Sequence, residues 1–182
     1  MKNLYESFVF AISLILAGSA FASETPVYSD NKGQLQVPSV KVDGVPGVYQ
    51  DIIMKFEDSD TLRMLSVKEG VLLDYINQVN SFQTNTFPVQ VFLEISGTFP
   101  SGCGAIGQIL QTVTGNDFSV LVYFENDAWL ESPESVACTL AMRPFKKVIA
   151  LDVYGLQAGT YGYTLNDKFS GSFSLATDNR IQ

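Results

Sequence analysis

Hydrophobic and polar residues alternate along most of the chain, and this period of two is typical of β-strands. The clearest example is PVQVFLEIS (88–96), in which valine, leucine and isoleucine occupy every second position, with Gln90 and Glu94 between them and Phe92 suggesting partial cover of the polar side. Similar runs continue to residue 176, with turns predicted at TGND and at Asn166-Asp167. Short strands at spacings of roughly eight to twelve residues predict an all-β sandwich over residues 87–176.

The segment upstream of this sandwich, residues 35–86, predicts a small β-meander and one short helix. LQVPSVKV, VYQDIIMKF and TLRMLSV are strand-like, DGVPG supplies a turn, and a register shift is expected near Pro38. In EGVLLDYINQVN (69–80), apolar residues recur at steps of three and four, which is the spacing of one helix face.

The first 22 residues have the features of a secretory signal peptide. Lys2 precedes the apolar run from Phe8 to Ala17, and Ala20-Phe21-Ala22 has the small-x-small pattern read by signal peptidase. A run of this length is too short to span a bilayer, although an uncleaved anchor is the alternative. We therefore expect a periplasmic or secreted protein without stable membrane insertion after cleavage: signal peptide 1–22, flexible leader 23–34, the segments 35–86 and 87–176, and a tail 177–182.

Composition excludes several classes of function. The chain has no histidine, so it lacks the imidazole base of Ser-His-Asp and Cys-His catalysis and the commonest ligand of zinc, copper and iron sites. We predict no catalytic residue, no metal site and no cofactor. The net charge is −8, from 19 acidic and 11 basic residues, and it would repel phosphate backbones. Nucleic acid is therefore not an expected partner.

Cys103 and Cys138 are the only two cysteines. An exported chain meets an oxidising environment, where an even number of cysteines usually pairs, and the C-x-x-C spacing of a redox motif is missing. We predict a structural disulfide that stabilises the fold by about 3 to 4 kcal/mol. A free thiol or an intermolecular link is the alternative.

Two aromatic residues are candidates for special roles. In GLQAGTY (155–161), two glycines precede Tyr161, whose hydroxyl can bond back to an upstream carbonyl as a structural tyrosine corner. Contact of Tyr161 with a ligand is the alternative. Trp129, the only tryptophan, lies in the irregular stretch NDAWLESPES and is a candidate ligand contact, with burial against the sandwich as its alternative.

The C-terminal half resembles a pattern found in uncharacterised exported bacterial proteins with an immunoglobulin-like sandwich. The matching segments are SGTFPSGC (96–103), GNDFSVLV (115–122), ACTLAMRPF (137–145), VIALDVYGLQAGTYGYTLN (148–166) and FSGSFSL (169–175). LQVPSVKVDGVPGVYQDIIMKF is similar to β-hairpin segments of secreted bacterial domains. The resemblance implies an immunoglobulin-like β-sandwich over residues 87–176, stapled by a disulfide between the two cysteines, and export of the protein. It implies no catalytic residue and no substrate.

Acidic residues leave two further hypotheses open. Glu57-Asp58-Ser59-Asp60 and Glu125-Asn126-Asp127 lie at predicted strand ends and could hold calcium, although neither has EF-hand spacing and exposed turn charges are the ordinary interpretation. A carboxylate-based glycoside hydrolase would need two acids about 5 to 10 Å apart across a cleft. The candidates for such a pair are Asp74, Glu131 and Glu134.

Taken together, the sequence favours a non-catalytic exported module that binds a protein or a surface glycan. The alternative is a structural subunit that assembles by strand pairing, as in fimbriae. A glycoside hydrolase is the third hypothesis.

Overall fold

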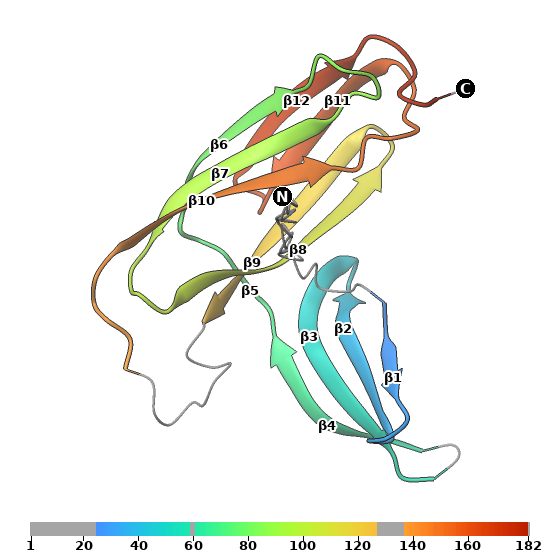
Figure 1. Ribbon diagram of the computed structural model, residues 1–182, viewed down its shortest axis with the longest axis vertical. Helices are drawn as coiled ribbons and strands as arrows, with labels where there is room; N and C mark the ends of the chain where they lie inside the picture. Colours follow the sequence, from blue (N-terminus) through green and yellow to red (C-terminus); the bar gives the residue numbers. More distant parts are fainter. Residues whose placement is uncertain (1–24, 59–60, 127–136, 182) are drawn as a thin grey trace, which may run out of the picture.

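The computed structural model describes residues 25–58, 61–126 and 137–181, which form an elongated all-β molecule with two parts (Figure 1). A four-stranded sheet, the N-terminal sheet, lies at one end, and a β-sandwich occupies the rest. The described residues contain no helix, and hence none long and apolar enough to cross a membrane.

The N-terminal sheet is antiparallel, and its strands follow one another in chain order: β1 (Val27–Ser29), β2 (Gln34–Val42), β3 (Val45–Phe56) and β4 (Leu62–Glu69). The predicted turn joins β2 to β3 at Asp43-Gly44, where both residues have positive φ, 49° and 83°. The register of β2 shifts between Val40 and Lys41, two residues beyond Pro38. The expected leader contributes β1, which pairs with β2.

The sandwich is built from two sheets. The first has the order β10-β7-β6 and is antiparallel: β10 (Arg143–Leu151), β7 (Val91–Phe99) and β6 (Ile76–Gln83). The second is organised around β9 (Asp117–Asn126), which pairs with three strands. Its three partners are β5 (Val71–Leu72), β8 (Gly104–Thr114) and β11 (Gly159–Leu165). The remaining strand, β12 (Phe169–Leu175), lies at the edge of the sheet and pairs with β11.

The order of strands differs from an immunoglobulin sandwich in one sheet. In the first sheet, the strands β6, β7 and β10 pair in the same order as strands A, B and E of that fold. In the second sheet, β9 lies between β8 and β11 and runs parallel to β11, with Gly162 opposite Asp117 and Leu165 opposite Val120. In an immunoglobulin domain, by contrast, the third strand lies directly beside the sixth, and these two strands correspond to β8 and β11. The predicted all-β sandwich is therefore confirmed, whereas the immunoglobulin order is not reproduced in this sheet.

The core lies between the two sheets and follows the predicted alternation. Along β7, Val91, Leu93, Ile95 and Phe99 are fully buried, and Val120 of β9 packs against them in the same cluster. On the outer face of β7, the Phe92 ring stacks on the Phe82 ring, with centroids 5.3 Å apart. Burial of one face of each sheet accounts for the period-two pattern of the sequence.

The predicted helix at 69–80 is wrong. Its residues form β5 and β6, joined by a turn at Asp74-Tyr75. Leu73 and Ile76 are both buried in the core, and their spacing of three arises because the turn lies between them. Pairing of β5 with β9 and of β6 with β7 supplies the backbone hydrogen bonds that a helix would have made internally.

The sandwich consequently begins earlier in the chain than expected. Since β5 and β6 belong to its two sheets, the change from the N-terminal sheet to the sandwich occurs near Gly70 rather than at Phe87.

Buried asparagines satisfy backbone groups where strands end. Asn166 has a φ of 49°, and its side chain accepts from the Val122 amide at 2.7 Å and donates to the carbonyl oxygens of Leu73 and Val122 at 3.0 and 3.1 Å. Asn179 makes three comparable bonds, to Val89 and Val153. These side chains let irregular segments lie within the protein without unpaired polar groups.

Candidate interaction surface of the N-terminal sheet

The N-terminal sheet has one apolar face near its free end. Strand pairing places Tyr28, Leu35, Met54 and Met64 in a single row across the four strands, and Phe56 pairs with Leu62 two rows further along. Alternate residues of a strand share a face, so these six side chains lie together. The rings of Tyr28 and Phe56 meet edge to face, with centroids 5.8 Å apart. We call these six residues the apolar face.

Much of the apolar face is open to solvent. The exposed fractions are 57% for Met64, 50% for Tyr28, 40% for Leu62 and 39% for Phe56. The row between the two rows of the apolar face carries Gln34, Lys55 and Arg63 on the opposite face, so the sheet is amphipathic. A sheet of this kind normally packs its apolar face on a second layer, and exposed apolar patches mark contact surfaces.

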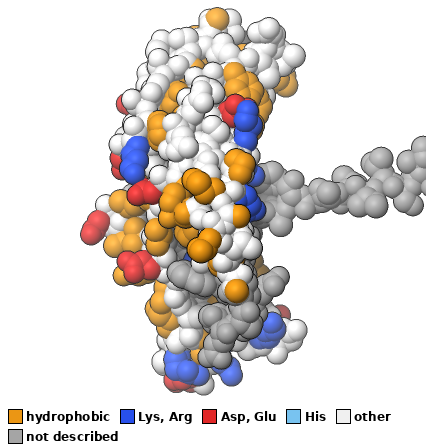
Figure 2. All heavy atoms as spheres, turned by 90° about the vertical axis from the view of Figure 1, so that its left-hand side faces the viewer, with side chains coloured by type: hydrophobic (Ala, Val, Ile, Leu, Met, Phe, Trp, Pro, Cys, Tyr) orange, Lys and Arg blue, Asp and Glu red, His pale blue; other side chains and the backbone are white. Residues whose placement is uncertain are grey.

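The strand β4 adds an open edge to this surface. Among the described residues it pairs only with β3, and its outer edge therefore presents unpaired backbone N–H and C=O groups. Leu65 and Val67 are exposed on it in addition to Leu62 and Met64. Figure 2 views the molecule from the side on which β4 lies in Figure 1, and hydrophobic side chains are exposed in several places along that side.

Hydrogen bonds from the sandwich hold the N-terminal sheet in place. The hydroxyl of Tyr123, on β9, donates to the carbonyl oxygen of Pro46 at 2.5 Å, and the Gln108 amide donates to the carbonyl oxygen of Pro38 at 2.8 Å. Burial raises the pKa of the Tyr123 hydroxyl, because the charged phenolate would lose its hydration. The aromatic ring of Tyr123 packs with Leu110 and Leu121 in a second, smaller core.

Two glycines allow the close approach of the two parts. A Cβ on Gly70 would lie 2.2 Å from the carbonyl oxygen of Gly47 and 2.7 Å from the Tyr123 ring. At Gly47, where φ is +79°, a Cβ would lie 2.6 Å from a methyl carbon of Leu110. The buried Gln50 side chain fills the remaining space and donates to the Gly47 carbonyl oxygen at 2.9 Å. Backbone contact, rather than side chains alone, thus sets the position of the sheet on the sandwich.

A cleft of about 320 Å³ lies beside this junction, between the end of β4, β5 and the end of β9. Val71, Tyr75 and Phe124 form part of its apolar lining, and Tyr75 and Phe124 meet edge to face with ring centroids 5.7 Å apart. The volume is in the range of small-ligand sites.

Three charged residues line the cleft, Lys68, Glu69 and Asp74, and two of them, Lys68 and Asp74, are held in ion pairs. Lys68 pairs with Glu125 where both side chains are largely shielded from solvent, and Asp74 accepts from Lys168 at 2.7 Å in an exposed position. The cleft therefore has the character of an apolar contact site with a polar rim.

Comparison with known proteins places the sandwich in a family. The model of the ORF11 β-sandwich domain matches residues 93–175. Two proteins of Herpetosiphon aurantiacus, described as uncharacterised 10.2 kDa proteins in the HgiBIM and HgiEIM 5′ regions, are each 32% identical over 82 residues, which make up 45% of this chain and 92% of each relative. The chain belongs to the ORF11 β-sandwich domain family. No solved structure matches it.

The ORF11 domain match covers the chain from β7 to β12 and leaves the N-terminal sheet outside. Less than a tenth of each relative lies beyond its matched part, which leaves no room for a further four-stranded sheet. The apolar face and the β4 edge therefore belong to a part of this chain that the ORF11 domain does not account for.

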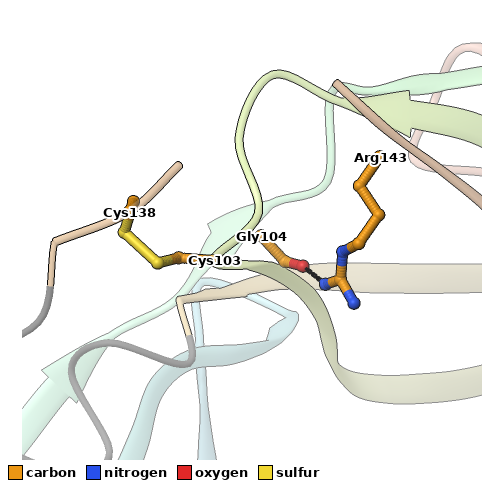
Figure 3. The surroundings of a disulfide bond; sticks show 4 residues. All are labelled: Cys103, Gly104, Cys138 and Arg143. Carbon is orange, nitrogen blue, oxygen red and sulfur yellow. Dashed lines mark hydrogen bonds between the residues drawn. A yellow bond between two sulfur atoms is a disulfide. The ribbon is translucent and has the colours of Figure 1, made fainter. Parts of the chain in front are cut away.

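The disulfide lies within the ORF11 domain and is confirmed. Cys103 and Cys138 are bonded, with their Cα atoms 5.4 Å apart (Figure 3). Arg143 donates to the carbonyl oxygen of Gly104, next to Cys103, and its guanidinium carbon lies 5.3 Å from the centroid of the Phe99 ring. Together these contacts tie the start of β8 to the segment that leads into β10.

Of the two aromatic candidates, Tyr161 and Trp129, the structure describes only Tyr161. The Tyr161 hydroxyl donates to the carbonyl oxygen of Gln157 at 2.8 Å, so this buried residue bonds back to the chain four positions upstream. Trp129 lies outside the described residues, and its role as a ligand contact stays a prediction.

The acidic clusters are partly described. Glu57 forms an ion pair with Arg63, and the Asp58 carboxylate accepts from the Thr61 amide at 2.8 Å. No group of three or more Asp, Glu, Cys or His in the described part of the chain is placed to hold a metal ion. Ser59, Asp60, Asp127, Glu131 and Glu134 lie outside the described residues, so the calcium and glycosidase hypotheses remain untested there.

The sequence predicted the strands β2, β3 and β4 of the N-terminal sheet, but it assigned β1 to the flexible leader 23–34 and gave no sign of the exposed surface. The alternation of Leu62, Arg63 and Met64 carries a signal for one apolar and one polar face. Nothing local in the sequence says that β4 lies at an edge or that no second layer of described residues faces it.

Proposed function

We propose that this protein is a non-catalytic exported interaction module that contacts a protein or a surface glycan through the apolar face of its N-terminal sheet. The observation that carries the proposal is the exposure of Tyr28, Phe56, Leu62 and Met64 on one side of an amphipathic sheet. Aromatic residues and methionine are enriched at protein interfaces. The aliphatic share of the face favours a protein over a glycan as the partner.

Export is supported by the composition of the N-terminal segment and by the disulfide. The charged, apolar and small-residue sequence of residues 1–22 is typical of a signal peptide. Structural disulfides persist in oxidising compartments, and Cys103–Cys138 is a bond of this kind.

Site-specific photocrosslinking in exporting cells tests the proposal. A photoreactive phenylalanine analogue at Met64 samples the apolar face, and the same analogue at Thr164, on the exposed outer face of β11, serves as the control. We expect adducts from position 64 only, with the mass of the adduct giving the partner. Equal adducts from both positions, or none from position 64, would contradict the proposal.

A structural subunit that assembles by strand pairing is the second candidate. The observation that favours it is the open, apolar edge of β4. Edge strands recruit other strands through main-chain hydrogen bonds, and side chains set the register.

A further inference from the structure

We propose that two copies of this protein associate by antiparallel pairing of their β4 strands, with Ser66 of one copy opposite Ser66 of the other. The inference rests on the function proposed above, because it uses the same sheet, and it names a second copy as the partner. Such pairing joins two four-stranded sheets into one eight-stranded sheet with an extended apolar face.

The exposed edge of β4 differs from the other sheet edges in the described part of the chain by its exposed apolar side chains, since the edge strands β6, β8 and β12 also lack proline and lysine but expose at most one large apolar side chain each. β4 is eight residues long, contains no proline and carries four exposed large apolar side chains. By contrast, β1 at the other edge of the same sheet has three residues, and the edge strand β10 carries Pro144, Lys146 and Lys147. Short length, proline, lysine and β-bulges are the usual protections against edge pairing. β4 lacks the first two and carries lysine only near its end, at Lys68, but its pairing with β3 has a register shift where Met54 lies opposite Met64 and Ile53 opposite Ser66.

The charges of β4 are complementary to those of a second β4 in the opposite direction. Arg63 is near the start of the strand and Glu69 is its last residue. With Ser66 at the centre, each Arg63 lies beside Glu69 of the other copy, and the pair occurs twice. Moving the centre by one residue would place Arg63 beside Val67, or Glu69 beside Leu65. Charge pairing therefore selects one register among the neighbouring ones.

The present partner of Arg63 does not prevent this exchange. Arg63 pairs with Glu57, and both side chains are about half exposed. Exposed ion pairs contribute little to stability, so the guanidinium can turn to a new carboxylate at small cost.

Overall charge repulsion between copies is weak at this surface. The segment from Thr25 to Glu69 holds seven acidic and five basic residues, whereas the whole chain has a net charge of −8. Most of the excess negative charge thus belongs to other parts of the chain. At physiological salt, charges more than about 8 Å apart are largely screened.

Charge reversal with rescue tests the proposal. We compare the mature wild-type chain with Arg63→Glu, Glu69→Arg and the double variant by sedimentation equilibrium. The wild type is expected to dimerise, each single reversal to weaken the dimer by roughly tenfold because it opposes like charges, and the double variant to recover dimerisation. A wild type that is monomeric at every concentration, or a double variant no stronger than the single ones, would overturn the proposal.

Cysteine crosslinking tests the register separately. Directly opposite residues of antiparallel strands have Cα atoms about 4.5 to 5.5 Å apart, within reach of a disulfide. Both native cysteines are bonded to each other, so Ser66→Cys introduces the only free thiol. Mild oxidation should yield a covalent dimer of Ser66→Cys and little dimer of the control Leu62→Cys, whose two copies would lie about 27 Å apart. A higher yield of covalent dimer from Leu62→Cys than from Ser66→Cys would overturn this register.

The outcomes also separate this inference from the function on which it rests. A monomeric wild type whose position 64 crosslinks to another molecule supports the interaction module and refutes self-pairing. A dimer through β4 without adducts of any other mass identifies the second copy as the partner.

Discussion

The hydroxyl oxygen of Tyr123 lies 2.5 Å from the carbonyl oxygen of Pro46, so a tyrosine on the central strand of the sandwich holds the N-terminal sheet. The ring of Tyr123 is almost fully buried between Leu110 and Gly70. Because the rest of the N-terminal sheet is largely exposed, this junction determines where the apolar face and the β4 edge are presented.

Tyr123→Phe should lower the free energy of unfolding by about 1 to 2 kcal/mol, since it leaves the Pro46 carbonyl oxygen without its donor. Urea denaturation followed by circular dichroism measures this change. Tyr154→Phe is the matched control, because the Tyr154 side chain is exposed, and its effect should be close to zero. Equal stability of the two variants would show that the bond contributes nothing.

The same tyrosine predicts a loss of stability at alkaline pH. Burial raises the pKa of Tyr123, so the folded state holds the phenolic proton more tightly than the unfolded state, whose pKa is near 10. The stabilisation is therefore present below about pH 10 and decreases as the pH rises towards the folded pKa. Urea titrations at pH 8 and pH 11 should show that the wild type loses its advantage over Tyr123→Phe. A constant difference would contradict the raised pKa.

Asn166→Ala should destabilise the sandwich through unpaired backbone groups. The substitution removes the acceptor of the Val122 amide and the donors to the carbonyl oxygens of Leu73 and Val122. Asp167→Ala is the matched control: φ is 49° at Asn166 and 55° at Asp167, so both alanines carry the cost of positive φ, but Asp167 is exposed. We expect Asn166→Ala to be less stable than Asp167→Ala by about 2 to 4 kcal/mol in thermal or urea unfolding. Similar values for the two variants would assign the cost to backbone conformation alone.

Removal of the disulfide should lower stability by about 3 to 4 kcal/mol, because the unfolded chain regains the freedom of a 35-residue loop. The double variant Cys103→Ala with Cys138→Ala is compared with the wild type in urea. A reductant should lower the stability of the wild type to that of the variant and leave the variant unchanged. Alkylation of the non-reduced, unfolded wild type followed by mass spectrometry should find no free thiol.

Several elements of the fold could be predicted because their signals are local. The alternation in 88–96 corresponds to β7, and Asn166-Asp167 forms a turn with positive φ at both residues. The error at 69–80 has an equally specific cause. Apolar residues at steps of three and four are compatible with a helix face, and also with two strands separated by a turn that buries Leu73 and Ile76 in one core. Only the strands β7 and β9, distant in sequence, decide between these two structures.

The apolar face of the N-terminal sheet likewise depends partly on local sequence signals and partly on contacts between distant strands. The spacing of Leu62 and Met64 assigns them to one face, but the place of Phe56 on that face depends on the pairing of β3 with β4, and the exposure of all three depends on what lies opposite them. Whether a strand is at an edge depends likewise on which strands pair with it.

The sequence by itself determined the all-β character and the identity of the cysteine pair, because residue period and the presence of only two cysteines are properties of the chain. The tertiary structure alone decided the parallel pairing of β9 with β11, the anchoring of Pro46 by Tyr123, and the exposure of the apolar face beside the open edge of β4. These features depend on contacts between residues far apart in sequence, and such contacts are selected by the free energy of the whole packed molecule rather than by local preference.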